Sequence, residues 1–475
     1  MAQPSKAFLS SAKSLLGEKG FLDTPEDMAP FLEDWRGREK GHAPFVARPA
    51  STQEVADFMA LCAEHKVSVT PQGGNSGLVL GGLPNGDVLL SLSRMKNIRA
   101  IDVLNDSITV DAGVILTEVQ DAADEVERLF PLSLAAEGVA QIGGLISTNA
   151  GGVAVLRYGM MRDLVLGLEI VTADGRIWDG LTGLRKDNTA YDLKQLFIGA
   201  EGTLGVITGA TLKLFAKPAL KAVSWLSVQS PSQAVELLAL AKAETGGAVT
   251  SFELVPSYAV ELVKEYIPDI HDPLPDEPAP WRILMEISFG RKEGARDVIE
   301  AMFEKALSAD LITNGVLAET DAQAAGIWKI RESVPLAEKA FGRAVKHDVS
   351  VPVSALPEFI RTADAAVKSI APEANIISFG HVGDGNMHYN VAPPEGAEEV
   401  AFAKEFGPVL TKAVHDVVSG MNGSISAEHG IGVQKRDELA ERVSAVELDM
   451  LRAVKKALDP ENRMNPGKVV RHPDA

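Results

Sequence analysis

The chain has 475 residues, with 46 Lys and Arg against 65 Asp and Glu, which gives a formal net charge of −19. This length predicts two to four domains with large cores, and 46% hydrophobic with 23% charged residues argues against disorder. The acidic balance disfavours nucleic acid and anionic membrane surfaces as partners, because both are bound through clustered Lys and Arg. Since Cys62 is the only cysteine, an intramolecular disulfide, a thiolate zinc site and a cysteine-held iron–sulfur cluster are excluded.

The N-terminal region lacks a continuous apolar segment. Lys6 and Lys13 are followed closely by Glu18, Asp23 and Glu26, which does not fit a secretory signal. We expect a short helical segment on a cytoplasmic protein, with the amphipathic start of an organellar presequence as the alternative. No run of about 20 apolar residues occurs, so no membrane span is expected.

The first regular segment begins at Ser51. Ser51 and Glu54 have capping-box spacing, and the apolar positions that follow, up to Cys62, recur at helical spacing. Residues 67–70 predict a short strand ending at Pro71, a glycine loop follows over 72–78, and residues 88–92 predict a second strand. This order of helix, strand, glycine loop and strand suggests an α+β nucleotide-binding unit.

Two more glycine-rich stretches follow, over 138–159 and 199–205. Residues 168–172 predict a strand that enters a hairpin turn, and alternate apolar residues over 208–214 predict another. Beyond residue 220 the pattern becomes more helical, with clear helices over 234–241, 355–370 and 445–458, while the acidic, proline-rich stretch 268–280 predicts a surface loop.

The glycines favour an anion held by backbone amides. No Lys or Arg occurs between Lys66 and Arg94, and Glu137 is the only charged residue between Arg128 and Arg157. Consecutive N–H groups in such loops form anion-binding nests. Tight turns in a β-rich domain are the alternative for any one cluster. Because the G-x-G-x-x-G fingerprint is missing, a standard NAD site is disfavoured, and three glycine clusters fit FAD better.

The strongest chemical signal is a histidine pair near a predicted turn. Residues 383–385 should turn the chain and place His381 and His388 roughly opposite one another on paired strands, with His388 and Asn390 on one face. Two converging imidazoles suit a divalent metal, and Glu428 is the expected third ligand. Its neighbour His429 has a pKa range suited to accepting a proton.

These motifs together resemble the FAD-linked oxidase family, which has the p-cresol methylhydroxylase/vanillyl-alcohol oxidase fold, and within it the D-2-hydroxyacid dehydrogenases. The motifs that carry the resemblance are Pro71–Gly77, Gln141–Gly152, Gly202–Gly205, Gly380–His388, Glu428–Gly430 and Asn465–Lys468. The resemblance spans about residues 40–470. It implies an α+β fold with a two-subdomain FAD-binding domain, a substrate domain with an antiparallel sheet and a C-terminal helical segment. The expected boundaries are 1–40, 41–219, 220–420 and 421–475.

The resemblance also implies which residues bind FAD. The expected cofactor-binding residues are Pro71, Gly73, Gly74, Asn75, Ser76, Gly77, Gly138, Gly143, Gly144, Ser147, Thr148, Gly151, Gly152, Ile207 and Asn465. Some relatives tether the flavin through a histidine, but residues 67–93 contain none. Noncovalent FAD is therefore expected.

For the active site, the resemblance implies His381, His388 and Glu428 as ligands of a divalent metal, usually zinc, with His429 as the catalytic base. Asn390, Arg331 and Lys346 match residues that contact substrate. One departure concerns Pro335, which stands where the D-2-hydroxyglutarate enzymes have a threonine, so the exact substrate is open.

The expected reaction is the metal-assisted oxidation of a D-2-hydroxy acid to the 2-oxo acid, with hydride transfer to the flavin. D-2-hydroxyglutarate is the favoured substrate because it could occupy both Arg331 and Lys346, and D-lactate is the alternative. A non-redox FAD transferase and a flavin-free metal-dependent hydrolase are different-class alternatives. With one cysteine there is no built-in cluster relay, so electrons must pass to a separate carrier protein or quinone. A homodimer is a family-level expectation.

Overall fold

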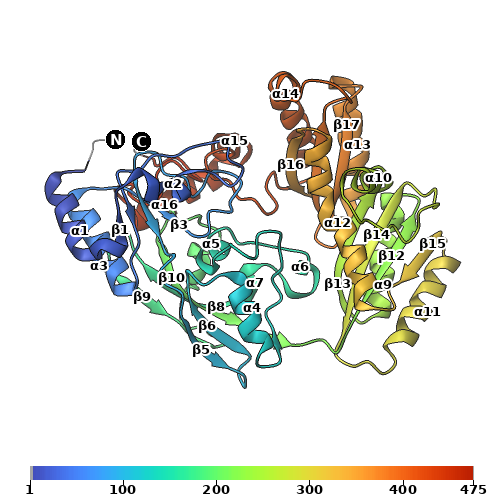
Figure 1. The fold of residues 1–475 in the computed structure, drawn as a ribbon, viewed down its shortest axis with the longest axis horizontal. Helices are drawn as coiled ribbons and strands as arrows, with labels where there is room; N and C mark the ends of the chain where they lie inside the picture. The colour runs from blue at the N-terminus through green and yellow to red at the C-terminus, as the bar shows by residue number, and fades with distance from the viewer. Residues whose placement is uncertain (1–3, 474–475) are drawn as a thin grey trace. The chain divides into compact units, whose positions relative to one another are not determined.

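The computed structural model describes residues 4–473. Two compact units account for the chain (Figure 1). The first contains everything up to Gly151, then Gly159–Lys217 and the chain from Glu428 onward, and the second contains Gly152–Tyr158 and Pro218–Ala427. The mixed helix and sheet content agrees with the predicted α+β class. No helix in the described range is long and apolar enough to cross a bilayer.

The first unit is built around two main sheets. One has the strand order β1(Phe21–Leu22), β2(Val46–Ala47), β4(Val88–Ser91), β3(Val69–Gln72), in which β4 runs parallel to β2 and β3. The other is antiparallel, in the order β5(Ile98–Asp102), β6(Ser107–Asp111), β10(Val206–Lys213), β8(Val165–Val171), β9(Ile177–Gly180). A small two-stranded sheet pairs β7(Arg128–Leu129) with β11(Phe215–Ala216).

The helices of this unit are α1(Lys6–Gly20), α2(Pro25–Leu32), α3(Thr52–His65), α4(Leu116–Asp124), α5(Ile142–Ser147), α7(Met161–Leu164), α8(Lys194–Phe197), α15(Arg436–Arg442) and α16(Ala445–Leu458).

Helix α3 forms as its sequence predicts. The Ser51 hydroxyl accepts a hydrogen bond from the Glu54 N–H at 3.2 Å, which satisfies one donor of the open first turn. The face that carries Phe58, Met59 and Cys62 is fully buried. Cys62 is therefore a core residue, and burial raises the pKa of its thiol.

Strand β3 differs from its predicted bounds. The predicted strand stops at Pro71, whereas β3 runs from Val69 to Gln72 and pairs Pro71 with Leu90 of β4. Proline is tolerated here because β3 is an edge strand of its sheet, and its outer side carries an isolated bridge between Val69 and Met464 but no continuous ladder.

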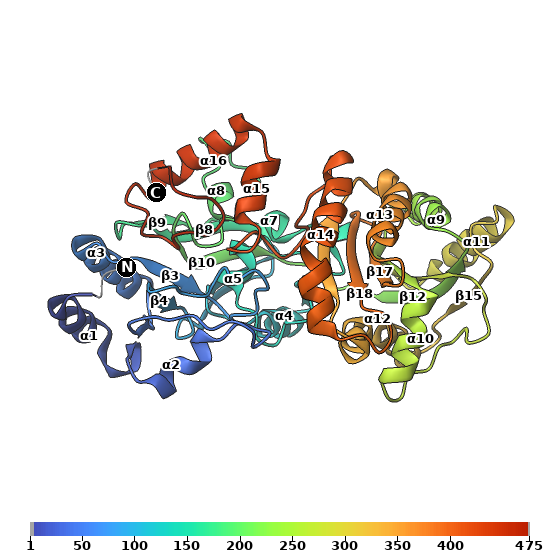
Figure 2. The same ribbon diagram turned by 90° about the horizontal axis from the view of Figure 1, so that it is seen from above.

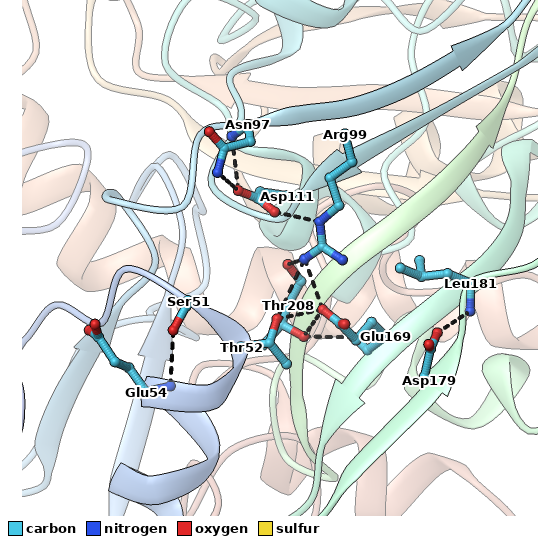
Figure 3. A network of polar contacts seen from close by, with 10 residues as sticks. All are labelled: Ser51, Thr52, Glu54, Asn97, Arg99, Asp111, Glu169, Asp179, Leu181 and Thr208. Atoms are coloured by element: carbon cyan, nitrogen blue, oxygen red, sulfur yellow. Dashed lines mark hydrogen bonds and ion pairs between the residues drawn. The ribbon is translucent and has the colours of Figure 1, made fainter.

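A polar network ties α3 to the antiparallel sheet (Figure 3). The Arg99 guanidinium of β5 binds Asp111 of β6 at 2.6 Å and Glu169 of β8 at 2.9 Å. Glu169 also accepts hydrogen bonds from Thr52 and Thr208. Burial by itself raises the pKa of the Glu169 carboxyl, but these hydrogen bonds outweigh it and the pKa is lowered.

The second unit is a seven-stranded antiparallel sheet covered by helices on both faces (Figure 2). The strand order is β15(Asn314–Leu317), β12(Leu220–Val228), β14(Trp281–Phe289), β13(Val249–Pro256), β17(Asn375–His381), β18(Asn386–Ala392), β16(Val345–Ser350). One face packs against α9(Pro231–Glu244), α11(Ala295–Ser308), α13(Leu356–Ile370) and α14(Glu399–Gly420). The other packs against α10(Ser257–Tyr266) and α12(Asp321–Phe341), while the short α6(Val155–Tyr158) contacts β13 and a 3-10 turn at Val353–Ala355 precedes α13.

Strand alternation decides which face of this sheet carries polar groups. In β18, Met387, Tyr389 and Val391 enter the core under α13 and α14. The intervening residues His388 and Asn390 therefore lie on the face that α12 covers. The shared face predicted for them is confirmed, and it is the face on which the candidate site is built.

Candidate active site

A glycine-rich pocket lies in the first unit. Twelve of the expected FAD-binding residues line it, namely Pro71, Gly73, Gly74, Asn75, Ser76, Gly77, Gly143, Gly144, Ser147, Thr148, Gly151 and Ile207. Sequence reasoning missed other lining residues, among them Trp35, the stretch Leu78–Leu83 and Gln141. None of the described lining residues is Lys or Arg. An anion in this pocket would therefore be met by backbone amides, which fits the pyrophosphate of FAD.

Close approach between segments requires one of these glycines and leaves little room at a second. A Cβ on Gly74 would collide with the carbonyl of Val139, and one on Gly73 would lie 3.3 Å from the Gly144 Cα. The loop after β3 thus packs directly on the loop that leads into α5. Asn75 adopts a left-handed φ of 54° between them, which helps to curve the backbone into a nest.

Three expected FAD residues do not line the pocket. Gly138 and Gly152 lie outside its lining, and Gly152 belongs to the second unit. Asn465 is buried, and its amide nitrogen donates to the carbonyls of Gly81 at 2.9 Å and Glu201 at 2.7 Å. The observed contacts of Asn465 hold two lining segments of the pocket together.

Glu201 positions the segment that contains His429. Its carboxylate accepts hydrogen bonds from the backbone N–H groups of Ile431 at 2.7 Å and Gly432 at 2.9 Å. Glu428 and His429, just before these residues, line the glycine-rich pocket. Burial raises the pKa of Glu201, and the two N–H donors oppose that shift.

His381, His388 and Glu428 form the one group of metal-capable side chains found among the described residues. Their ligand atoms all lie within 4.8 Å of one another. The hairpin of β17 and β18 supplies both histidines. Glu428 directly follows Ala427, whose N–H donates to the carbonyl of Asp348 in β16 at 3.2 Å. Two imidazoles and one carboxylate make a donor set that suits zinc.

The hairpin register refines the predicted placement of the histidines. His381 pairs with Asn386, and His388 pairs with Phe379, so the two imidazoles are diagonal neighbours and not directly opposite. Their ring centroids are still only 5.5 Å apart. The turn requires Gly385, because a Cβ at its positive φ of 78° would collide with the carbonyl of Val351.

A buried carboxylate joins a metal-ligand candidate to a substrate-binding candidate. Glu253 of β13 binds the Nδ1 of His381 at 2.6 Å and the Nε of Arg331 at 2.8 Å. Burial opposes its ionisation, but the contacts with His381 and Arg331 lower the pKa of Glu253 to about 2. The Arg331 guanidinium also lies over the Phe379 ring, 4.8 Å from its centroid. Arg331 is thus held from two sides on α12.

A second buried carboxylate gathers the remaining substrate-binding candidates. Glu338, seven positions after Arg331 on α12, binds Lys346 at 3.3 Å and accepts a hydrogen bond from the Asn390 amide at 2.8 Å. Lys346 and Asn390 are cross-strand partners in β16 and β18. Pro335 lies between Arg331 and Glu338 and is exposed. It lacks the N–H that would otherwise bond to the Arg331 carbonyl within the helix.

Three carboxylates of this region were missed by sequence reasoning: Glu201, Glu253 and Glu338. Each is at least nine-tenths buried. Glu201 lies within the recognised 199–205 glycine motif, where a lone acidic residue among glycines was a usable signal. Glu253 lies in an otherwise apolar strand and Glu338 in an amphipathic helix, and their partners are distant in sequence.

Comparisons with known proteins agree with this architecture. Residues 217–469 match the family model "FAD linked oxidases, C-terminal domain" and residues 43–180 match "FAD binding domain". The chain is 35% identical over 463 residues to the probable mitochondrial D-2-hydroxyglutarate dehydrogenase of Oryza sativa subsp. indica, covering 97% of this chain and 81% of that one. It is 35% identical over 475 residues to a putative mitochondrial D-lactate dehydrogenase of Schizosaccharomyces pombe, covering 96% and 89%.

The fold also has a solved counterpart. The crystal structure of p-cresol methylhydroxylase with substrate bound superimposes with a TM-score of 0.77 at 17% identity, covering 100% of both chains. At this identity the likeness concerns the fold alone. With a family match over more than half of the chain and relatives at 35% identity along nearly all of it, the protein belongs to the FAD-linked oxidases and is an FAD-dependent oxidoreductase.

Proposed function

We propose that this protein oxidises a D-2-hydroxy acid to the corresponding 2-oxo acid, with D-2-hydroxyglutarate as the first candidate substrate and D-lactate as the second. The proposal is carried by one observation. The ligand atoms of His381, His388 and Glu428 lie within 4.8 Å of one another, and Glu428 and its neighbour His429 line the glycine-rich pocket. The printed names of the rice and fission-yeast relatives support the substrate class.

The proposed roles follow from the chemistry of each side chain. A bound FAD would supply the hydride acceptor, and a bound divalent metal, zinc in our proposal, would supply a Lewis acid that lowers the pKa of the substrate hydroxyl. His381, His388 and Glu428 would hold the metal, and the pocket residues would hold FAD without a covalent bond. His429 would accept the hydroxyl proton. Arg331, Lys346 and Asn390 would bind the substrate carboxylates.

The two cations favour a dicarboxylate. Arg331 and Lys346 are each paired with a buried carboxylate, Glu253 and Glu338 respectively, and each retains N–H groups that can face a ligand. D-2-hydroxyglutarate has a carboxylate for each cation, whereas D-lactate has one in total. Pro335 offers no hydroxyl to a ligand. The second carboxylate of D-2-hydroxyglutarate would therefore be bound by Arg331 or Lys346 without a hydrogen bond from position 335.

An anaerobic visible spectrum tests the reaction directly. The purified protein should show flavin bands near about 450 nm that bleach on addition of D-2-hydroxyglutarate. If D-lactate bleaches the bands and D-2-hydroxyglutarate does not, D-lactate is the substrate. A protein that lacks flavin bands, yet contains stoichiometric metal and hydrolyses substrates, would contradict the proposal in favour of the flavin-free hydrolase. Bands that no 2-hydroxy acid bleaches would favour a non-redox transferase.

The role of His429 has a separate test. His429→Ala should lower kcat by about 10²–10⁴-fold, as expected for loss of a general base. The variant should still bind FAD, so that its flavin absorbance with saturating FAD equals that of the wild type. Retention of more than a tenth of the activity at neutral pH would remove His429 from this role. The matched control is His65→Ala, because His65 ends α3 and is not among the residues that line the pocket.

Three further features belong to this proposal. Electrons would pass to a separate carrier protein or a quinone, and reduction of a soluble quinone by the substrate-reduced protein tests this.

We propose that the protein forms a homodimer, and sedimentation analysis tests this. We propose a cytoplasmic location, whereas the relatives from rice and Schizosaccharomyces pombe are named mitochondrial, and cell fractionation decides between the two.

A further inference from the structure

The Glu253 carboxylate has two partners that the proposed function assigns to different tasks. Its Oε1 lies 2.6 Å from the Nδ1 of His381, and its Oε2 accepts the Nε–H of Arg331 at 2.8 Å. His381 belongs to the candidate metal group, and Arg331 is the candidate for binding a substrate carboxylate. All three side chains lie in the second unit.

The sheet register explains why these groups meet. Glu253 of β13 stands directly opposite His381 of β17. Strand alternation places both on the face that α12 covers, because Val255 of β13 and Phe379 of β17 pack into the core on that side. Arg331 reaches the same point from α12, and its guanidinium stacks on the Phe379 ring. Glu253 is fully buried, so water does not compete for its two oxygens.

This geometry fixes the chemistry of the His381 ring. A carboxylate only accepts hydrogen bonds, so the Nδ1 of His381 carries the proton that is shared with Glu253. In the neutral ring, which is the form that binds a metal, the other nitrogen, Nε2, then keeps its lone pair. A carboxylate behind a histidine ligand orients the ring and raises its basicity, and the loss of such a partner typically weakens metal binding by about 10–100-fold.

The same carboxylate holds Arg331. Because its Nε is bound to Glu253, the terminal Nη atoms of Arg331 remain available for a substrate carboxylate. We therefore propose that Glu253 is a positioning residue that sets the His381 ring for metal binding and fixes Arg331 for substrate binding at the same time. This inference rests on the proposed function and adds to it a physical link between metal affinity and substrate affinity.

The test uses the FAD-loaded protein with Glu253→Gln. The single amide oxygen of the glutamine would keep accepting the Nε–H of Arg331, so its NH2 group would face Nδ1 and donate a hydrogen bond to it. This favours the tautomer that is protonated at Nε2 and removes the metal-binding lone pair. We expect zinc affinity, measured by competition with a chromophoric chelator, to fall by about 10–100-fold. We also expect the KM for the 2-hydroxy acid to rise, since Arg331 loses its charged partner.

Two further variants separate positioning from general damage. Glu253→Asp keeps the charge and should recover a large part of the zinc affinity. Glu286→Gln is the matched control, because Glu286 lies on the neighbouring strand β14 and binds Trp328 and Thr250. It should leave zinc affinity unchanged. The proposal is overturned if Glu253→Gln is folded and binds zinc as tightly as the wild type, or if Glu286→Gln weakens zinc to the same extent.

A second readout keeps this inference distinct from the proposed function. The ¹⁵N ring shifts of His381, recorded on metal-free protein and assigned with His381→Gln, report the tautomer without any turnover. We expect a protonated Nδ1 in the wild type and a protonated Nε2 in Glu253→Gln. If the wild type neither binds zinc nor oxidises a 2-hydroxy acid, the proposed function fails, while this tautomer change would still support the role of Glu253. An identical tautomer in both proteins would overturn the proposed role of Glu253.

Discussion

At the scale of single residues, buried carboxylates determine how the candidate substrate site is organised. Glu338 is 1% exposed as a side chain and lies 3.3 Å from the Lys346 ammonium. It also accepts a hydrogen bond from Asn390. A buried carboxylate that holds two groups of one site makes their positions interdependent.

Glu338→Gln should therefore affect substrate binding more than the chemical step. The Lys346 ammonium would lose its charged partner, and we expect KM to rise by roughly 5–30-fold, which corresponds to one or two kcal/mol. Steady-state kinetics with the identified 2-hydroxy acid measures this. Glu358→Gln, at an exposed pair on α13, is the control. A fall in kcat with KM unchanged would contradict the assignment.

Cys62 provides a residue-scale test of burial. Its thiol is 1% exposed in the core of α3, and burial raises its pKa, so thiolate is scarce at pH 8. A chromogenic disulfide reagent should react slowly with the folded protein. It should then titrate one thiol per chain after unfolding in guanidinium chloride, because the sequence has one cysteine. Rapid labelling of the folded protein would show that α3 is not packed as described.

At the scale of elements, buried polar contacts add to hydrophobic packing in joining helices to strands and loops. The Arg99 network joins α3, β5, β6, β8 and β10 (Figure 3). On α16, the buried ammonium of Lys455 bonds to Asp459 and to the carbonyls of Thr203 and Met464. Both sets of contacts connect segments that are far apart in the sequence.

Glu169→Gln should destabilise the first unit in a pH-dependent way. The variant leaves Arg99 with a weaker partner, and we expect a loss of about 1–3 kcal/mol at pH 7. Because the pKa of Glu169 is lowered in the folded protein, its contribution is present above the ordinary carboxyl value of 4.5 and is lost as pH falls through the folded pKa. Urea unfolding at pH 7 and near pH 3.5 should show the two proteins converging at the lower pH. A difference that grows on acidification would contradict this.

At the scale of the whole molecule, the candidate site residues divide between the two units. The first unit contains the glycine-rich pocket with Glu428 and His429 on its lining. The second contains the sheet that carries both histidines of the candidate metal group and the three candidate substrate contacts. The C-terminal segment belongs to the first unit, although the whole second unit precedes it in sequence.

FAD should protect the first unit in preference to the second. Ligand at 100 times its Kd stabilises the state that binds it by about 2.7 kcal/mol. Hydrogen exchange followed by mass spectrometry should therefore slow at residues 71–83 and 141–148 when FAD is restored to stripped protein. The core strands β12 and β14 of the second unit serve as the internal reference. Equal protection of β12 and the pocket loops would contradict this prediction.

Much of the local structure could be predicted from the sequence. Capping at Ser51, apolar periodicity in α9, α13 and α16, and the turn over 383–385 depend on neighbours within a few residues, and local propensity and turn chemistry decide such features. The glycine clusters and the His381–His388 hairpin belong to the same class. Their motif order also indicated the family, which the comparisons then established.

The tertiary structure alone decided which partners the buried carboxylates meet. Glu253 and His381 are 128 positions apart and meet because β13 and β17 are neighbours in one register. A one-residue shift of that register would move Glu253 to the opposite face. Glu201 likewise reaches Ile431 across 230 positions. Such pairings depend on strand order and helix packing between distant segments, and no local pattern of residues specifies them.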